Sequence, residues 1–99
     1  MKKFINKKCV VRGDRSGVFF GTVKSIDGQT VEMENVRRLW HWDGANTITE
    51  IATNGVTKPE NCKFTVEVKN LLLLDVIEIN IATEKAIESI DKVQVWTRH

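Results

Sequence analysis

The sequence predicts an α+β fold, a small, mostly antiparallel β-sheet domain with two short helices. Three observations support this prediction. Apolar and polar residues alternate over most of the chain, with the period of two that half-buried strands show. Only two stretches have helical spacing, and each follows a threonine that can cap a helix. The chain has 99 residues and no linker-like tract, which favours a single domain, residues 1–99.

The first part of the chain predicts three strands, at residues 8–12, 18–26 and 30–42. A glycine-rich turn at residues 13–17 separates the first two strands, and Asp27-Gly28 predicts a tight hairpin between the second and the third. Gly21 indicates a bend, a bulge or close packing in the second strand. The third strand is long, and we expect it to bend or break near Asn35.

Two short helices are expected after threonine caps. Thr47 begins a capping-box pattern, with a glutamate three residues later, and Asn54-Gly55 ends this helix. Thr83 caps a second helix at residues 84–92. The remaining alternating stretches predict three further strands, at residues 63–68, 71–82 and 93–98.

Charge is unevenly distributed along the chain. The formal net charge is only +2, less than a protein that holds nucleic acid mainly through its phosphates usually carries. Residues 1–24, however, hold seven Lys and Arg against one acidic residue. We therefore expect any anion site to use this first part of the chain and the isolated pair Arg37-Arg38.

The sequence carries no recognisable catalytic or metal-binding pattern. Two histidines are present, His41 and His99, and there is no nucleophile elbow, phosphate loop or Cys-x-x-Cys motif. Cys9 and Cys62 stand in apolar, alternating contexts, where a thiol acts as a small hydrophobe, so we expect both to be free. We expect a non-enzymatic protein that uses no metal and no cofactor.

Targeting and membrane-spanning segments are not expected. No apolar stretch of signal-peptide length follows the N-terminal lysines, and the longest apolar run is residues 71–74. These features predict a cytoplasmic protein. The same leucine run and the three tryptophans exceed what one core of this size should absorb, which predicts a homo-oligomer.

Arg12 and Arg15 form a first candidate anion site. They flank a glycine-rich turn, where guanidinium groups and backbone N–H groups can converge on a phosphate. Solvated turn charges are the alternative interpretation.

The segment RRLWHWDG is the densest candidate cluster. Strand alternation places Arg38, Trp40 and Trp42 on one face, and Arg37 with His41 on the other. An indole beside a guanidinium can stack a purine while the arginine holds a phosphate. A place in the core or in an oligomer interface is the alternative for both tryptophans.

A first resemblance to a known family is local. Residues 18–36 (VFFGTVKSIDGQTVEMENV) resemble the first motif of Sm-like small barrels, a Gly-Thr-Val strand and an acidic turn before an alternating strand that ends in Asn. The second Sm motif, a short strand with Arg-Gly or Lys-Gly, is absent downstream. This resemblance implies an RNA-binding protein, which is the alternative to the function described next.

A longer resemblance covers nearly the whole chain. The segments VVRGDRSGVFFGTV, NVRRLWHWDGA, KPENCKF and DVIEI…VWT resemble a family of small phage and prophage proteins that counter Thoeris immunity. The resemblance implies a sponge that sequesters, without cleaving, the cyclic ADP-ribose-type signals of bacterial TIR-domain enzymes. Some members also bind cyclic oligonucleotides. It further implies action in the cytoplasm of an infected bacterial cell, as a dimer or hexamer. His41 departs from the aromatic residue expected at its position.

These inferences together predict a site for an adenine-containing cyclic nucleotide with a pyrophosphate, bound between protomers. The residues expected to hold the phosphates are Arg12, Arg15, Arg37, Arg38 and Arg98. Stacking is expected from Trp40, Trp42 and Phe20, or from Trp96 if the first two are scaffold. Hydrogen bonds to ribose or adenine are expected from Asn46, Thr47 and Asn61.

Overall fold

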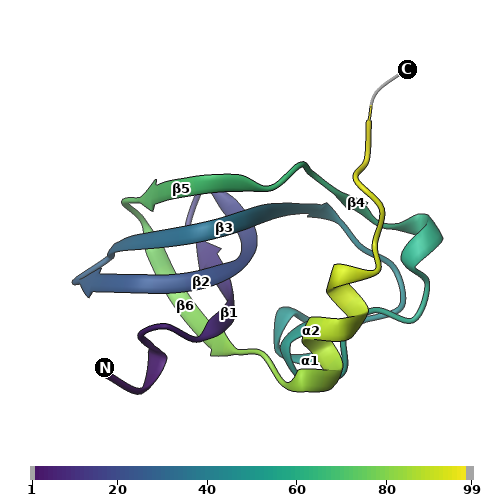
Figure 1. Cartoon of the computed structure of the whole chain (residues 1–99), viewed down its shortest axis with the longest axis horizontal. Coiled ribbons are helices and arrows are strands. Elements are labelled where there is room, and N and C mark those ends of the chain that lie inside the picture. Colours follow the sequence, from purple (N-terminus) through teal and green to yellow (C-terminus); the bar gives the residue numbers. More distant parts are fainter. Residues whose placement is uncertain (1, 98–99) are drawn as a thin grey trace.

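Three antiparallel strands form the centre of the fold in the computed structural model, which describes residues 2–97 (Figure 1). They are β1 (Lys8–Gly13), β2 (Gly17–Asp27) and β3 (Thr30–His41), preceded by a single 3-10 turn, η1 (Lys2–Phe4). The predicted hairpin between β2 and β3 is confirmed, because Asp27 pairs with Thr30. Gly28 has a φ of 59°, which tight hairpin turns require and glycine adopts without steric cost.

The bend predicted in β3 is a bulge at Asn35, which has a φ of 54°. Phe20 of β2 pairs with Arg37, whereas Thr22 pairs with Glu34, so β3 holds one extra residue here. Gly21 lies opposite, and a Cβ built on it would lie 2.9 Å from a methyl carbon of Val36. The close packing predicted at Gly21 is therefore confirmed, and the side chains of β3 change faces after the bulge.

The outer edge of β3 is shared by two strands. Its first half pairs with β5 (Val68–Leu73) and its second half with β4 (Lys63–Phe64). At the other end of the sheet, β6 (Val76–Ile81) pairs with β1, which gives the strand order β4–β3–β2–β1–β6, with β5 also paired with β3. All pairs of named strands are antiparallel, so the predicted sheet is confirmed.

Three predicted strands need correction. The single strand predicted at residues 71–82 is two strands, because the chain turns at Leu74 and Asp75. The strand predicted at residues 63–68 is reduced to the two residues of β4. In place of the strand predicted at residues 93–98, the described residues up to 97 form a single parallel bridge, between Val95 and Phe64.

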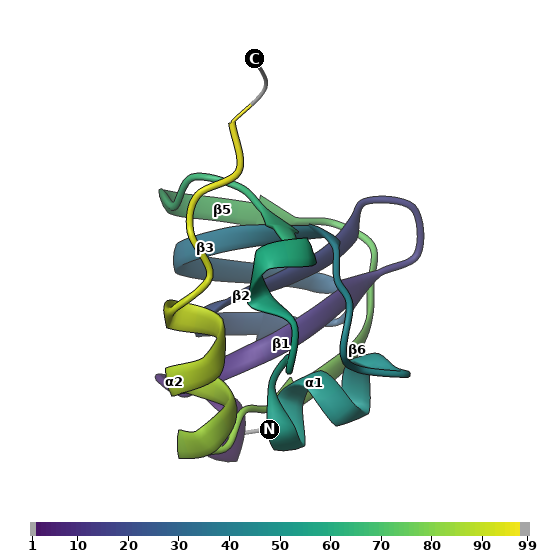
Figure 2. The same cartoon turned by 90° about the vertical axis from the view of Figure 1, so that its right-hand side faces the viewer.

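Both predicted helices are present, and threonine caps each. In α1 (Ile48–Asn54) the N–H of Glu50 donates to the Thr47 hydroxyl at 3.3 Å, and Gly55, with a φ of 77°, ends the helix. In α2 (Glu84–Asp91) the N–H of Ala86 donates to the Thr83 hydroxyl at 3.1 Å. A 3-10 turn, η2 (Pro59–Asn61), follows α1. Figures 1 and 2 show α1 and α2 side by side against one part of the sheet.

The strands and helices enclose two separate cores. The sheet core lies inside the curve of the strands, and its buried residues are Cys9, Val11, Phe19, Val23, Val31, Met33, Val36, Leu73 and Val76. The helix core lies between the sheet and the helices, and its buried residues are Val10, Phe20, Leu39, Ile48, Ile51, Ala52, Val56, Cys62, Phe64, Ala82, Ala86, Ile90 and Val93. β1 contributes to both cores because successive side chains point to opposite faces.

The two cysteines are buried free thiols, one in each core, as their apolar contexts predicted. Burial raises the pKa of Cys9 to about 11 and also raises the pKa of Cys62 above its ordinary value. Burial therefore disfavours the reactive thiolate form of both cysteines.

The leucine run at residues 71–74 is divided by strand alternation. Leu73 is buried in the sheet core, whereas Leu72 and Leu74 are 59% and 69% exposed. Within residues 2–97, no helix is both long enough and apolar enough to cross a membrane.

Candidate functional site

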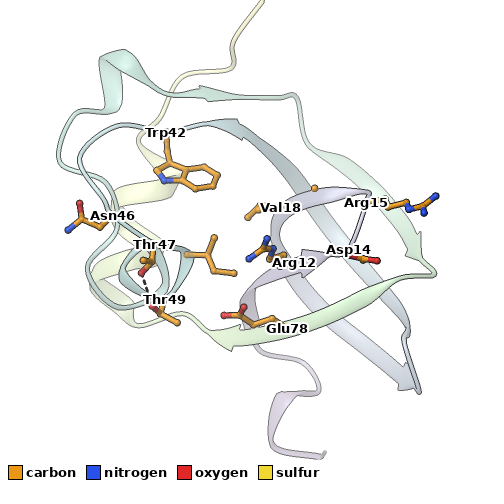
Figure 3. Close-up of a pocket in the computed structure, with 12 residues that line it drawn as sticks. Arg12, Asp14, Arg15, Val18, Trp42, Asn46, Thr47, Thr49 and Glu78 are labelled. Carbon is orange, nitrogen blue, oxygen red and sulfur yellow. Dashed lines mark hydrogen bonds between the residues drawn. The ribbon is translucent and has the colours of Figure 1, made fainter.

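A hollow of about 630 Å³ opens between the β1–β2 turn and the start of α1 (Figure 3). We call it the Arg12 pocket. Its lining residues are Arg12, Gly13, Asp14, Arg15, Gly17, Val18, Trp42, Asn46, Thr47, Ile48, Thr49 and Glu78. Its volume falls within the range of about 300–1,000 Å³ that small-molecule sites occupy.

Arg12 is placed in this pocket by strand register. It pairs with Val18 of β2 on one side and with Glu78 of β6 on the other, so these three side chains share one face of the sheet. In Figure 3 the guanidinium of Arg12 lies between Val18 and Glu78. No hydrogen bond or ion pair within residues 2–97 uses this guanidinium, and its donors are therefore available to a ligand.

Trp42 forms the opposite wall of the pocket. It is the first residue after β3, is half-buried, and packs against the helix core. Figure 3 shows its indole across the hollow from Glu78. The ring thus has apolar support from the helix core while part of it stays accessible from the pocket.

Asp75 organises the turn that forms the rim. Its carboxylate accepts the N–H of Arg15 at 2.7 Å, the N–H of Ser16 at 3.0 Å and the Ser16 hydroxyl at 2.7 Å. The Ser16 hydroxyl, followed by the Arg15 N–H, holds the pKa of Asp75 below its ordinary value. A side chain at Gly13 requires the turn to rearrange, because a Cβ there would overlap the Ser16 hydroxyl and lie 2.7 Å from the Asp75 carboxylate.

Further polar groups of the pocket come from the start of α1 and from β6. The hydroxyls of Thr47 and Thr49 lie 2.8 Å apart. The Glu78 carboxylate is half-buried and accepts one hydrogen bond, from the Asn80 side chain to Oε2 at 2.9 Å. Hydroxyls, a carboxylate, a guanidinium and an indole therefore face one hollow.

A family model for a domain of unknown function, DUF6948, matches residues 6–90. The chain belongs to the DUF6948 family. The match covers all six strands and every residue that lines the Arg12 pocket. No curated protein matches the chain.

The DUF6948 fold brings together five of the residues predicted for the site. They are Arg12, Arg15, Trp42, Asn46 and Thr47. In Figure 3 the side chains of Arg15 and Asn46 point away from the hollow, so these two residues line it mainly through backbone and side-chain stem. Arg98 lies outside the described residues.

Two predicted site residues are corrected by their burial in the DUF6948 domain. Phe20 is 3% exposed and belongs to the helix core. Arg37 is 7% exposed, and its three nitrogens donate to the carbonyl oxygens of Thr65, Ile90 and Phe64 at 3.0, 3.2 and 3.3 Å. Burial lowers the pKa of Arg37 below its ordinary value. Arg37 is thus a structural cation that ties β3 to the segment after β4 and to α2.

Arg38 and Trp40 lie on the opposite, exposed face of β3, as strand alternation predicted. Arg38 covers the Phe19 ring, 4.5 Å from its centroid, and donates to the carbonyl of Ser16. Trp42 departs from the prediction of a shared face, because β3 ends at His41 and Trp42 turns toward the helix core.

Trp40 belongs to a second aromatic group, the Trp40–Trp96 cluster. The two ring centroids are 4.9 Å apart, and Nζ of Lys63 lies 5.2 Å from the first and 5.4 Å from the second. Asn61 lies near this cluster and donates to Asp43 at 3.0 Å, outside the Arg12 pocket. Trp96 lies beyond the residues that match the DUF6948 model.

Glu78, Val18 and Thr49 are pocket residues that sequence reasoning did not assign to the site. Alternation along residues 76–80 could identify the face of Glu78. Its position opposite Arg12 depends on the pairing of β1 with β6, which are far apart in the sequence. Among residues 2–97, no group of three or more His, Cys, Asp or Glu is arranged to hold a metal ion.

Proposed function

We propose that this protein binds and sequesters an adenine-containing cyclic nucleotide of the cyclic ADP-ribose type and releases it uncleaved. In this proposal it acts as a phage anti-defence sponge in the cytoplasm of an infected bacterial cell. The observation that carries the proposal is the Arg12 pocket, where a guanidinium without a partner in residues 2–97 faces the same hollow as a half-buried indole.

The chemistry of the pocket matches a nucleotide group by group. A guanidinium can hold a phosphate through a bidentate pair of charge-assisted hydrogen bonds. The Trp42 indole, across the hollow, offers a face on which a purine can stack, worth about 1–3 kcal/mol. Backbone groups of the β1–β2 turn and the hydroxyls of Thr47 and Thr49 supply further polar contacts.

Binding without turnover follows from the role proposed for these groups. A sponge requires affinity and no reaction, and the groups of the pocket are those that hold and orient a ligand. We assign no residue to catalysis, no metal and no cofactor.

A homo-oligomer, a dimer or a hexamer, remains part of the proposal. Leu72, Leu74 and Ile77 lie around the β5–β6 turn and are all more than half exposed. Burying them against another copy would remove apolar surface from water. Sedimentation at micromolar concentration tests this part, and a monomer would refute it.

The direct test is recovery of ligand. The protein is incubated with cyclic ADP-ribose isomers, freed of unbound ligand, heated, and the supernatant is analysed by mass spectrometry. The proposal predicts intact ligand from the wild-type chain and from Lys63→Ala, a control outside the pocket, but little from Arg12→Ala. Cleaved ligand would indicate an enzyme, and no ligand from the wild-type chain would refute the proposed function.

A second candidate, single-stranded RNA binding, is favoured by one observation. Trp40 is 58% exposed beside Lys63, an arrangement that can stack a base. Titrations against salt separate the candidates, because a polymer binder releases many counterions and a diphosphate ligand releases few. The sponge proposal predicts a shallow dependence of log K on log salt for its ligand, and weak RNA binding.

A further inference from the structure

The Arg12 pocket contains a carboxylate where an anion is proposed to bind. Glu78 pairs directly with Arg12 across β1 and β6 and lines the same hollow. A carboxylate repels a phosphate, so Glu78 cannot bind the phosphate group that Arg12 is proposed to hold. The question is which neutral group it can hold.

The free acceptor on Glu78 is well defined. Its Oε2 accepts from the Asn80 side chain at 2.9 Å, and Glu78 has no other hydrogen-bond partner within residues 2–97. Asn80 lies two residues further along β6, on the same face. It therefore orients the carboxylate and leaves Oε1 for a donor from the ligand.

The spacing identifies the donor. Residues directly opposite in an antiparallel pair have Cβ atoms about 4.5–5.5 Å apart, so Glu78 reaches the group next to the phosphate that Arg12 would hold. In cyclic ADP-ribose each phosphate adjoins a ribose on one side and the other phosphate on the other side, and the Glu78 carboxylate repels that second phosphate. The neutral neighbour that Glu78 can hold is therefore the ribose. The purine, one sugar further away, lies toward Trp42 across the hollow. Ribose hydroxyls are donors that carboxylates bind well in dinucleotide sites.

We infer that Glu78 accepts a hydrogen bond from the hydroxyls of the ribose adjoining the Arg12-bound phosphate, and that Asn80 positions it. This inference rests on the proposed function and adds a specificity element to it. The pocket then binds a phosphorylated ribose in preference to a bare polyphosphate. Glu78 accepts a hydrogen bond from the sugar, and its negative charge repels an additional phosphate.

The test compares two probes, cyclic ADP-ribose and inorganic pyrophosphate, by calorimetric titration of the full chain. Glu78→Gln should weaken cyclic ADP-ribose about tenfold or more, since a charge-assisted hydrogen bond is lost. The same variant should bind pyrophosphate as well as or better than the wild-type chain. Glu88→Gln is the matched control, since it makes the same change on the exposed face of α2, outside the pocket, and it should weaken neither probe.

The outcomes separate the inference from the proposed function. If Glu78→Gln leaves cyclic ADP-ribose affinity unchanged or raises it, Glu78 is only a repulsive charge and the inference is wrong, while the sponge proposal stands. If the wild-type chain binds no cyclic ADP-ribose, the proposed function fails and the inference with it. Should Glu78→Gln not fold, Glu78→Asp replaces it. That variant keeps the charge but withdraws the carboxylate, and the inference requires weaker cyclic ADP-ribose binding with pyrophosphate binding unchanged.

Discussion

Trp42 and Trp40 stand two residues apart in the sequence, yet their surroundings are opposite. Trp42 packs against the helix core and lines a hollow that also holds the guanidinium of Arg12, which has no partner among residues 2–97. Trp40 is 58% exposed on the sheet surface, with Trp96 against its ring and the Lys63 ammonium over it. One indole lines the pocket that contains Arg12. The other is exposed in a cluster whose Lys63 and Trp96 border a separate hollow.

The difference shows what turns an aromatic residue into a binding element. The protein must support one part of the ring, leave another part open, and place a charge that has no internal partner beside it. The Arg12 pocket meets these conditions. In the Trp40–Trp96 cluster, a second ring and a lysine already occupy the surroundings of Trp40, so we expect this cluster to contribute to stability more than to ligand binding.

The largest effect is expected at Arg37, on the strand that connects the two regions. Arg37→Met should lower the free energy of unfolding by about 3 kcal/mol, because three main-chain carbonyls lose a buried cationic donor. Urea denaturation measures the change, and Arg38→Met serves as the exposed neighbour with a smaller loss. A variant that keeps its stability but loses ligand would make Arg37 a ligand residue after all.

The next effect distinguishes the two tryptophans directly. Trp42→Ala should weaken cyclic ADP-ribose binding by about 1–3 kcal/mol, and Trp42→Phe should recover part of this loss. Trp40→Ala should leave the affinity unchanged. Trp42→Ala also loses packing against the helix core, which lowers its stability. Thermal melting of each variant therefore accompanies the titrations, to separate lost stacking from unfolding. Equal losses of affinity in both alanine variants would abolish the distinction between pocket and cluster.

A smaller effect is expected at Lys63. Removing its ammonium from the two indoles in Lys63→Ala should lower stability by about 0.5–1 kcal/mol, the scale of an exposed cation–π contact. Ligand affinity should not change. A marked loss of affinity in this variant would move the site to the cluster.

The smallest effect concerns the pocket rim and its response to acid. Because hydrogen bonds hold the pKa of folded Asp75 below its ordinary 3.8, its contribution to stability is present at neutral pH. That contribution is lost as the pH falls below 3.8 and through the folded value. Asp75→Asn should therefore show a shallower loss of stability in acid than the wild-type chain, measured by urea midpoints across this range. Identical acid profiles would show that the turn is not held by this carboxylate.

Local features of the fold were predictable from the sequence because their causes are local. The turn at Gly28, the caps at Thr47 and Thr83, and the bulge at Asn35 opposite Gly21 depend on a few adjacent residues or on one strand pair. The turn at Asp75 was missed within a long apolar stretch. Its hydrogen-bond partners lie some sixty residues earlier, in the β1–β2 turn.

The site was predictable only in part for the same reason. Arg12 and Thr47 stand in polar turn sequences that mark candidate sites by themselves. Glu78 acquires its position from the pairing of two strands distant in sequence. Arg37 looked like a ligand residue because its burial results from α2 and the segment after β4, which close over it.

The central claim is that the ligand binds beside Trp42 and not beside Trp40. The chain has three tryptophans, so a heteronuclear NMR spectrum of the full protein contains three indole N–H signals, which Trp→Phe variants assign. When cyclic ADP-ribose is added, the signal of Trp42 should shift while those of Trp40 and Trp96 stay in place. Shifts of the Trp40 and Trp96 signals with an unmoved Trp42 would contradict the account.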